Sequence, residues 1–343
     1  MTQKKIFKWE WGTLPAAQIS EPVQNAAKRI TERTNGELNV ELYGRDFVPE
    51  KEIFSAVGSG KLDMAFTWSG TAGPGVLHHC DVGQLPIWPS GIAGCMFTKA
   101  LVDKYFRSEM EALGFTPIVY EMNCAHDFGF FTANYHVQIW SKKMFTSLKD
   151  AEGARVSAQV GMSGEALASI GMAPTVMPYA GIIPALSENS VDAALLPAPG
   201  PMFFKLDDVT PYCLRIDYPE GNDDCTIMNT KTYNSLPSDI RNIVIEEVKR
   251  LMMDPRMDRS AMSERAREYN NALVTAGKLK IIELTPNEKA WCKKQWETEL
   301  VDIWIKNAIA AGLKDAKAYL DDVLKIRDSI LASGLPQYPG ALA

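Results

Sequence analysis

The chain has 343 residues, of which 46% are hydrophobic and 23% are charged. This composition is that of an ordinary globular protein, and the length allows two lobes with separate cores. The formal net charge of −6 disfavours a nucleic-acid-binding surface, which would need clustered Lys and Arg. No apolar run in the sequence approaches the length of a membrane span.

The first part of the chain predicts alternating strands and helices. A strand over residues 6–11 is followed by a helix that begins after Ser20, a residue type that favours a helix N-cap. Alternating apolar residues predict a strand over 38–42, and a helix over 49–57 and a strand over 62–66 follow. This β-α-β-α-β order favours an α/β fold with a largely parallel sheet.

A short apolar strand predicted over residues 154–158 contains one charged residue, Arg155. A glycine-rich turn leads from this strand into a helix. A guanidinium in such a strand is costly to bury alone, so it needs a carboxylate partner. A neighbouring Asp or Glu of the protein is the structural interpretation, and the carboxylate of a ligand is the functional one.

Two segments of the chain, residues 54–65 and 183–194, resemble each other. In each, a helix ends at a residue that tolerates a left-handed conformation, and a short apolar strand with an aspartate follows. These residues are Gly60 and Asp63 in the first segment, and Asn189 and Asp192 in the second. The similarity indicates two similarly built α/β lobes, and chance similarity of one short unit is the alternative.

The last third of the chain predicts mostly helix, over about 239–252, 257–276 and 315–332, with a strand over 279–284. Thr285 and Glu288 form a capping-box pattern that opens a further helix. The tryptophans of that helix are expected to be packing anchors rather than ligand platforms. They are Trp291, Trp296 and Trp304.

The sequence contains no nucleophile elbow, phosphate-binding loop or dinucleotide-binding glycine motif. Residues 78–81, His-His-Cys-Asp, look like a metal-ligand cluster, but adjacent side chains in extended chain point to opposite faces. We therefore expect no metal and no cofactor. Two lobes without catalytic chemistry between them favour a binding protein over an enzyme.

Six cysteines are scattered along the chain, and none forms a Cys-x-x-Cys pair. The pairs closest in sequence are Cys213–Cys225 and Cys80–Cys95. One disulfide could form in an oxidising compartment. Buried thiols that act as small hydrophobic side chains are the alternative.

An ordered set of short motifs between residues 147 and 196 resembles the solute-binding proteins of tripartite ATP-independent periplasmic (TRAP) transporters, of the DctP type. The resemblance extends over roughly the first 300 residues. Further motifs in the family's order include Thr34-Asn35-Gly36, Leu85-Pro86 and Leu236-Pro237. The central motifs are Leu148, Lys149 and Arg155, then Gly171, Pro174 and Pro178, then Ala185, Leu186, Val191 and Asp192.

The resemblance implies a bilobal periplasmic-binding-protein type II fold, with two α/β lobes joined at a hinge near residues 128 and 216. The expected first lobe comprises residues 1–128 and 217–257. The second comprises residues 129–216 and 258–283. Residues 284–335 are expected to form C-terminal helices packed on the lobes.

The resemblance also implies a location and partners. It implies a periplasmic monomer whose signal peptide has been removed, so that this numbering begins after it. The implied partners are a small organic acid and the membrane permease subunits of a TRAP transporter. Closure of the lobes around the ligand is expected, and no nucleic-acid partner is.

The family position of the ligand-anchoring arginine falls on Arg155. Aligned on the motifs, further pocket positions fall on Trp68, Phe131 and Leu196, which are apolar where related proteins often carry polar groups. Tyr179 follows Pro178, where an aromatic residue is frequent. Trp11 could add to the walls, as could Trp9 and Phe203. The alternative is that these rings belong to the cores of the lobes.

One ionic anchor in an apolar, aromatic site would suit an aromatic monocarboxylate, such as an indole or phenyl acid. The hydroxyls of a sugar acid would be left without partners there. Alternative interpretations are a small aliphatic carboxylate or sulfonate, and an extracytoplasmic sensor of the same fold. An α/β enzyme is the remaining alternative, against which the lack of a nucleophile–base pair argues.

Overall fold

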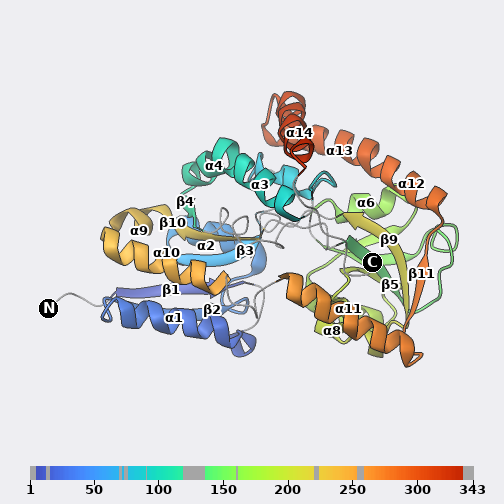
Figure 1. Ribbon diagram of the computed structural model, residues 1–343, viewed down its shortest axis with the longest axis horizontal. Coiled ribbons are helices and arrows are strands. Elements are labelled where there is room, and N and C mark those ends of the chain that lie inside the picture. Colours follow the sequence, from blue (N-terminus) through green and yellow to red (C-terminus); the bar gives the residue numbers. More distant parts are fainter. Residues whose placement is uncertain are drawn as a thin grey trace.

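The structure, a computed structural model, describes residues 5–12, 16–68, 72, 76–89, 91–118, 136–159, 161–219, 224–252 and 259–334. These residues form two β-sheets, each flanked by helices, in two lobes (Figure 1). The expected bilobal α/β fold is therefore confirmed. No helix in these ranges is both long enough and apolar enough to cross a membrane.

The first sheet has five strands in the order β2-β1-β3-β10-β4. β1 is parallel to both β2 and β3, whereas β10 is antiparallel to β3 and to β4. The strands are β1 Lys5–Trp11, β2 Leu38–Gly44, β3 Met64–Trp68, β4 Phe115–Pro117 and β10 Asp224–Asn229. This sheet and the helices on it are the first lobe.

The second sheet has six strands in the order β11-β9-β5-β8-β6-β7. β6 is parallel to β7 and β8, β5 is antiparallel to β8 and β9, and β11 is parallel to β9. The strands are β5 His136–Ser141, β6 Arg155–Ala158, β7 Ala173–Val176, β8 Ala193–Pro197, β9 Tyr212–Pro219 and β11 Lys280–Glu283. This sheet and its helices are the second lobe.

Most helices connect these strands. Those of the first lobe are α1 Glu21–Arg33, α2 Ile53–Ser59, α3 Gly91–Leu101, the π-helix η5 Val102–Phe106, α4 Arg107–Ala112, α9 Thr230–Ser235 and α10 Ser238–Met252. Those of the second are α6 Ser163–Ser169, α7 Tyr179–Ser187, α8 Gly200–Phe204 and α11 Arg259–Thr275. Short 3₁₀ turns are η1 Ala16–Gln18, η2 Glu50–Glu52, η4 Cys80–Gln84 and η7 Leu206–Asp208.

The chain passes between the two sheets at defined points. It leaves the first sheet after β4 and enters the second at β5, and it returns between β9 and β10. β9 stays in the second sheet as far as Pro219, three residues beyond the expected crossing at 216. The lobe boundaries expected from the sequence otherwise stay a prediction.

The C-terminal helices connect both lobes (Figure 1). The capping box predicted at Thr285 and Glu288 is present. Trp296 is buried and donates a hydrogen bond from Nε1 to the carbonyl of Ala166 in α6, while Tyr319 donates to the carbonyl of His79. The elements are α12 Pro286–Gln295, the π-helix η8 Trp296–Leu300, α13 Val301–Ala311 and α14 Ala316–Ala332.

Of the three tryptophans predicted to be packing anchors, Trp291 is not buried, so the prediction is wrong for that residue. Trp296 and Trp304 are buried, as a packing role requires. Trp291 is 43% exposed, because it lies on the solvent side of α12, where the buried residue is Cys292. Helical spacing alone therefore did not identify which face of α12 packs on the lobes.

The cysteine pair closest in sequence is not a disulfide. Cys213 lies in β9 of the second sheet and Cys225 in β10 of the first. Burial raises the pKa of the thiols of Cys213 and Cys292, the latter to about 12. Both are inert at neutral pH, which agrees with the role of small hydrophobic side chains.

A buried carboxylate joins α1 to α10 within the first lobe. Glu247 of α10 accepts hydrogen bonds from Arg29 Nε at 2.5 Å and from Arg33 Nη1 at 2.9 Å. Burial alone would raise the pKa of Glu247, but the hydrogen bonds from the two arginines outweigh it, so that pKa is lowered. The pair of helices therefore depends on an ionised Glu247.

We expect Glu247→Ala to reduce the free energy of unfolding by roughly 2 kcal/mol, because two charge-assisted hydrogen bonds are lost. The matched control is Glu246→Ala, since Glu246 is exposed and its one ion pair among the described residues is with Arg33. That control should cost less than about 0.5 kcal/mol. Urea unfolding measures both, and equal losses in the two variants would contradict the assignment.

The same interaction sets a pH dependence. Because the pKa of Glu247 is lower in the folded state than its ordinary value of 4.5, its stabilisation is fully present above that value. The stabilisation disappears as the pH falls through the folded-state pKa. The difference between the wild type and Glu247→Ala should therefore shrink below about pH 4.5.

Candidate functional site

The carboxyl ends of the parallel strands of both sheets lie at the boundary between the lobes. β9 ends at Pro219 and β10 begins at Asp224, so these two ends are within about 18 Å of each other. β1, β2 and β3 run opposite to β10, and β6, β7 and β8 run with β9. We call these ends the boundary edges. Ligands of open α/β sheets bind outside such ends.

Four of the six site residues expected from the sequence lie at the boundary edges. Trp11 ends β1, Trp68 ends β3, Leu196 is the penultimate residue of β8, and Tyr179 opens α7 shortly after β7. Phe131 lies outside the described residues. The backbone therefore brings most of the expected site to one region, from both lobes.

The side chains of two of these residues are buried within their lobes. Trp11 is 3% exposed and stacks on Phe66 at a centroid distance of 4.1 Å. Leu196 is fully buried in a core that includes Trp140. Both side chains therefore belong to the hydrophobic cores of the lobes, which is the alternative role considered for them. For Trp68 and Tyr179 only the backbone position is described.

Arg155 lies at the amino-terminal end of its strand in the second sheet, the end remote from the boundary edges. It is the first residue of β6, at the level of Ala173 in β7 and just before the level of Ala193 in β8. Gln159, which follows the carboxyl end of β6, is four residues further on, a distance of about 13 Å along a strand. The side chain of Arg155 therefore leaves the backbone at the end of β6 that is remote from the boundary edges.

The guanidinium of Arg155 is also bonded within the protein. Nε and Nη2 donate to the two carboxylate oxygens of Asp192 at 3.1 and 2.9 Å, and Nη2 donates to the carbonyl of Asn189 at 2.9 Å. These hydrogen bonds lower the pKa of Asp192. The expectation that Arg155 anchors a ligand is therefore not supported by this geometry, because a carboxylate of the chain itself fills the guanidinium fork.

The repeated segment explains why an aspartate stands beside Arg155. In the first lobe, the amide of Lys8 donates to Asp63 at 2.9 Å, and the amide of Asp63 donates to the carbonyl of Lys8. In the second lobe, the amides of Arg155 and Asp192 make the same reciprocal pair. Asp63 and Asp192 thus align the start of one strand with its parallel neighbour. Arg155 occupies the position that Lys8 occupies in the first lobe.

The sequence analysis missed two polar residues at the boundary edges. The described residues that directly follow carboxyl ends at this boundary include one charged residue, Arg45 after β2, and one other polar residue, Gln159 after β6. The rest are apolar or glycine, namely Gly12, Ile118, Met177 and Ala198. The buried amide nitrogen of Gln159 has no hydrogen-bond partner among the described residues. The same holds for the buried hydroxyl of Ser157, two residues earlier, in β6. Unsatisfied donors at this edge could meet an acceptor group of a ligand.

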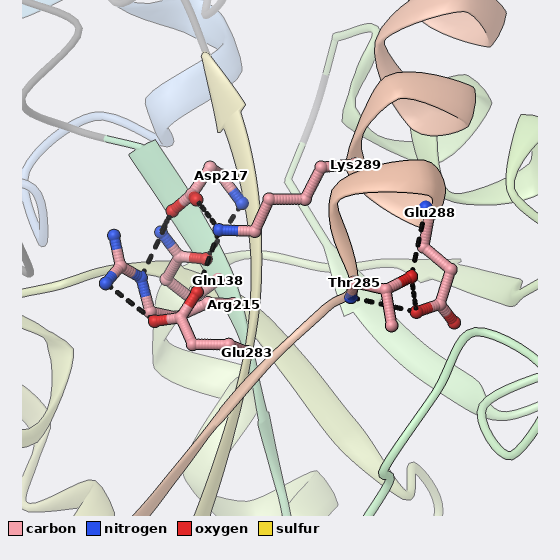
Figure 2. Close-up of polar contacts among 7 residues, drawn as sticks. All are labelled: Gln138, Arg215, Asp217, Glu283, Thr285, Glu288 and Lys289. Carbon is pink, nitrogen blue, oxygen red and sulfur yellow. Dashed lines mark hydrogen bonds and ion pairs between the residues drawn. The ribbon is translucent and has the colours of Figure 1, made fainter.

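A polar network fixes β9 close to where the chain crosses between the lobes (Figure 2). Asp217, with a left-handed φ of 53°, accepts hydrogen bonds from Gln138 Nε2 at 3.0 Å and from Lys289 Nζ at 2.5 Å. Lys289 and Arg215 both reach Glu283 as well. Burial would raise the pKa of Asp217, but its bond from Lys289 and the charge of Arg215 outweigh burial and lower it. The network thus joins α12 to the crossing strand.

The chain segment after β3 touches the second lobe at Gly161. The φ of Gly161 is 106°, a conformation that favours glycine, and a Cβ added there would lie 2.7 Å from Oε1 of Gln84, the far end of a flexible side chain that would have to shift. The hydroxyl of Tyr218 in β9 also donates to the carbonyl of Gln84, at 3.5 Å. These contacts bring the end of β6 close to the segment that contains η4.

No group of three or more His, Cys, Asp or Glu side chains among the described residues could hold a metal ion. Within residues 78–81, His79 instead binds Glu109 through its backbone amide and ring Nδ1, at 2.9 and 3.2 Å. This part of the chain therefore serves the packing of η4 on α4.

Comparison with known proteins identifies the family. Residues 15–307 match the model of bacterial extracellular solute-binding protein family 7, the DctP family. The chain therefore belongs to this family, as its motifs indicated. The members of this family are bacterial extracellular solute-binding proteins.

Solved structures with the same fold are TRAP periplasmic solute-binding proteins. One from Roseobacter denitrificans, with bound β-D-glucuronate, is 16% identical with a TM-score of 0.74, over 94% of this chain and 99% of that one. One from a marine metagenome, specific for aromatic acids and bound to 3-hydroxybenzoate, is 20% identical with a TM-score of 0.71, over 95% and 99%. One from Chromohalobacter salexigens, with bound (S)-2-amino-1-propanol, is 18% identical with a TM-score of 0.70, over 96% of each chain.

We expect Gly161→Ala to destabilise the protein more than Gly153→Ala. Both positions have positive φ, but a Cβ at Gly153 would meet nothing within 4 Å. Gly153→Ala therefore reports backbone strain alone, of about 1 to 2 kcal/mol. Gly161→Ala also forces the flexible end of the Gln84 side chain to shift, at a further cost of about 0.5 kcal/mol.

Urea unfolding of both variants, each with and without Gln84→Ala, measures the clash as a coupling free energy. Gln84→Ala should bring Gly161→Ala to the level of Gly153→Ala and leave Gly153→Ala unchanged. An absence of coupling between Gly161 and Gln84 would show that this approach is not made in solution.

Proposed function

We propose that this chain is the periplasmic component of a TRAP transporter and delivers a small organic acid to the membrane permease. The observation that carries this proposal is the arrangement of the boundary edges. The carboxyl ends of β1, β2 and β3 in one lobe, and of β6, β7 and β8 in the other, lie at the crossing between the lobes. A solute held there would contact both lobes, and closure of the lobes would exclude water from it.

An aromatic monocarboxylate is the solute class that the residues at these edges favour. Trp68 and Tyr179 lie at the boundary edges. Phe131, proposed from its family position, lies outside the described residues. Val176 ends β7 and is 56% exposed, and Phe203 in α8 is 51% exposed. Apolar and aromatic side chains in these positions would cover a ring and leave sugar hydroxyls without partners.

The ligands of similar proteins do not by themselves select a solute. Those proteins bind a sugar acid, an aromatic acid and an amino alcohol on one fold. The residues at the boundary edges must therefore determine which solute binds. We propose that the amide of Gln159 donates to the solute's carboxylate and that Arg45 supplies the positive charge.

A thermal-shift and calorimetric screen tests this proposal. We expect phenylacetate or indole-3-acetate to raise Tm more than succinate or gluconate. Gln159→Ala should weaken binding of the best acid roughly ten- to a hundredfold, since a hydrogen bond to a charged group is lost. Arg45→Ala should weaken it as well.

Arg155→Ala is the matched control, because it removes an arginine from the opposite edge of the same strand. The affinity of Arg155→Ala for the best acid of the screen should equal that of the wild type. Loss of binding in Arg155→Ala alone would restore that residue as the anchor and refute the assignment to Gln159. If succinate or gluconate binds best, the aromatic preference is wrong, and if no acid binds, the chain is not an organic-acid carrier.

A further inference from the structure

The turn that follows β2 places Arg45 at a boundary edge of the first lobe. The amide of Phe47 donates to the carbonyl of Gly44 at 2.9 Å, so Arg45 and Asp46 are the two central residues of this turn. The side chain of Arg45 is partly exposed, and no hydrogen bond or ion pair links it to another described residue. Its guanidinium is therefore accessible to a carboxylate from outside the protein.

Asp46, the neighbour of Arg45, is bonded to a different segment of the first lobe. Its Oδ1 accepts a hydrogen bond from the amide of Ala16 at 2.9 Å. Ala16 is the first residue of η1, which follows the carboxyl end of β1. This hydrogen bond therefore joins the segment after β1 to the turn after β2, both of which lie at the boundary edges of the first lobe.

The far side of the same turn is held by aromatic packing. Phe47 folds back onto Tyr43 of β2, with ring centroids 4.0 Å apart and an interplanar angle of 29°. The ammonium of Lys61 lies 5.8 Å from the centroid of the Phe47 ring. The backbone on the carboxyl side of Arg45 is thus fixed twice, by the hydrogen bond of Asp46 and by the stacking of Phe47.

We propose that Asp46 is a positioning residue, which fixes the turn after β2 and so holds the guanidinium of Arg45 at the boundary edge for the carboxylate of the solute. This role rests on the proposed function, in which Arg45 supplies the positive charge. A group that is held in place before binding loses less conformational entropy when the solute arrives. Loss of the bond between Asp46 and Ala16 therefore weakens binding through Arg45, although Asp46 itself does not contact the solute.

A double-mutant cycle, measured by calorimetry with phenylacetate as the probe, tests this role. Arg45→Ala should weaken binding about tenfold, because a charged hydrogen-bond donor is lost. Asp46→Ala should weaken it about fivefold in the wild-type background. In the Arg45→Ala background, Asp46→Ala should change the affinity by less than about twofold, because Asp46 acts only through Arg45.

Two further variants separate positioning from general stability and from charge. Asp46→Asn keeps an acceptor oxygen for the amide of Ala16, and it should bind phenylacetate within about twofold of wild type. Asp150→Ala is the matched control, since Asp150 is also exposed and accepts a hydrogen bond from the amide of Thr146 at 3.0 Å, in the segment that leads into the amino end of β6. It should leave the affinity unchanged.

The possible results separate this role from the proposed function. Equal effects of Asp46→Ala with and without Arg45, or an effect on Tm alone, refute the positioning role and leave the organic-acid function standing. Tighter binding in both Asp46→Ala and Asp46→Asn refutes it as well, because Asp46 would then act through its negative charge.

If Arg45→Ala binds phenylacetate as the wild type does, the assignment of the positive charge to Arg45 fails, and the role of Asp46 fails with it. If phenylacetate does not bind to the wild type, the proposed aromatic solute fails, together with the role of Asp46 in binding it.

Discussion

The short crossing from β9 to β10 is the constraint on which the rest of the arrangement depends. The chain has only residues 220–223 between a strand of the second sheet and a strand of the first. Because strand direction is set by pairing with β9 and β10, this crossing determines which ends of all the parallel strands face the other lobe. Asp217 holds β9 next to the crossing through Gln138 and Lys289, so that α12 is fixed to the same point. The boundary edges, and with them any shared ligand site, follow from these contacts.

Both lobes contain the same reciprocal hydrogen bonding between an aspartate and a backbone amide, at the start of a strand. The reciprocal pairs of Asp63 with Lys8 and of Asp192 with Arg155 align neighbouring strands at their amino ends. That leaves the carboxyl end of β6 for chemistry, where the amide nitrogen of Gln159 has no hydrogen-bond partner among the described residues. Because Asp192 already fills the guanidinium fork of Arg155 at the amino end of the same strand, we assign recognition to Gln159 rather than to Arg155.

The sequence allowed most of the elements to be predicted, and the failures have physical causes. Helix ends at Gly60 and Asn189 both have the expected positive φ, since few residues tolerate that conformation. The antiparallel strands β5 and β10 were not predicted, because pairing between distant segments leaves no local periodicity. Arg155 and Asp192 were both noticed, but only the register of Val156 with Ala193 places them side by side. Asp46 was overlooked, because its role depends on a tertiary hydrogen bond to Ala16, 30 residues earlier in the chain. Trp291 shows the same limit for a helix, as the exposed face of α12 is set by the lobes beneath it.

Hydrogen–deuterium exchange with and without phenylacetate would test most directly whether the solute binds at the boundary edges. The account predicts protection of amides at the ends of β1, β3, β6 and β7, from both lobes together. The amides around Arg155 and Asp192, at the opposite edge, should keep their exchange rates. Protection confined to residues 150–156 and 189–193, with unchanged exchange at the ends of β1 and β3, would contradict the central claim that the carboxyl ends of the two sheets form the site.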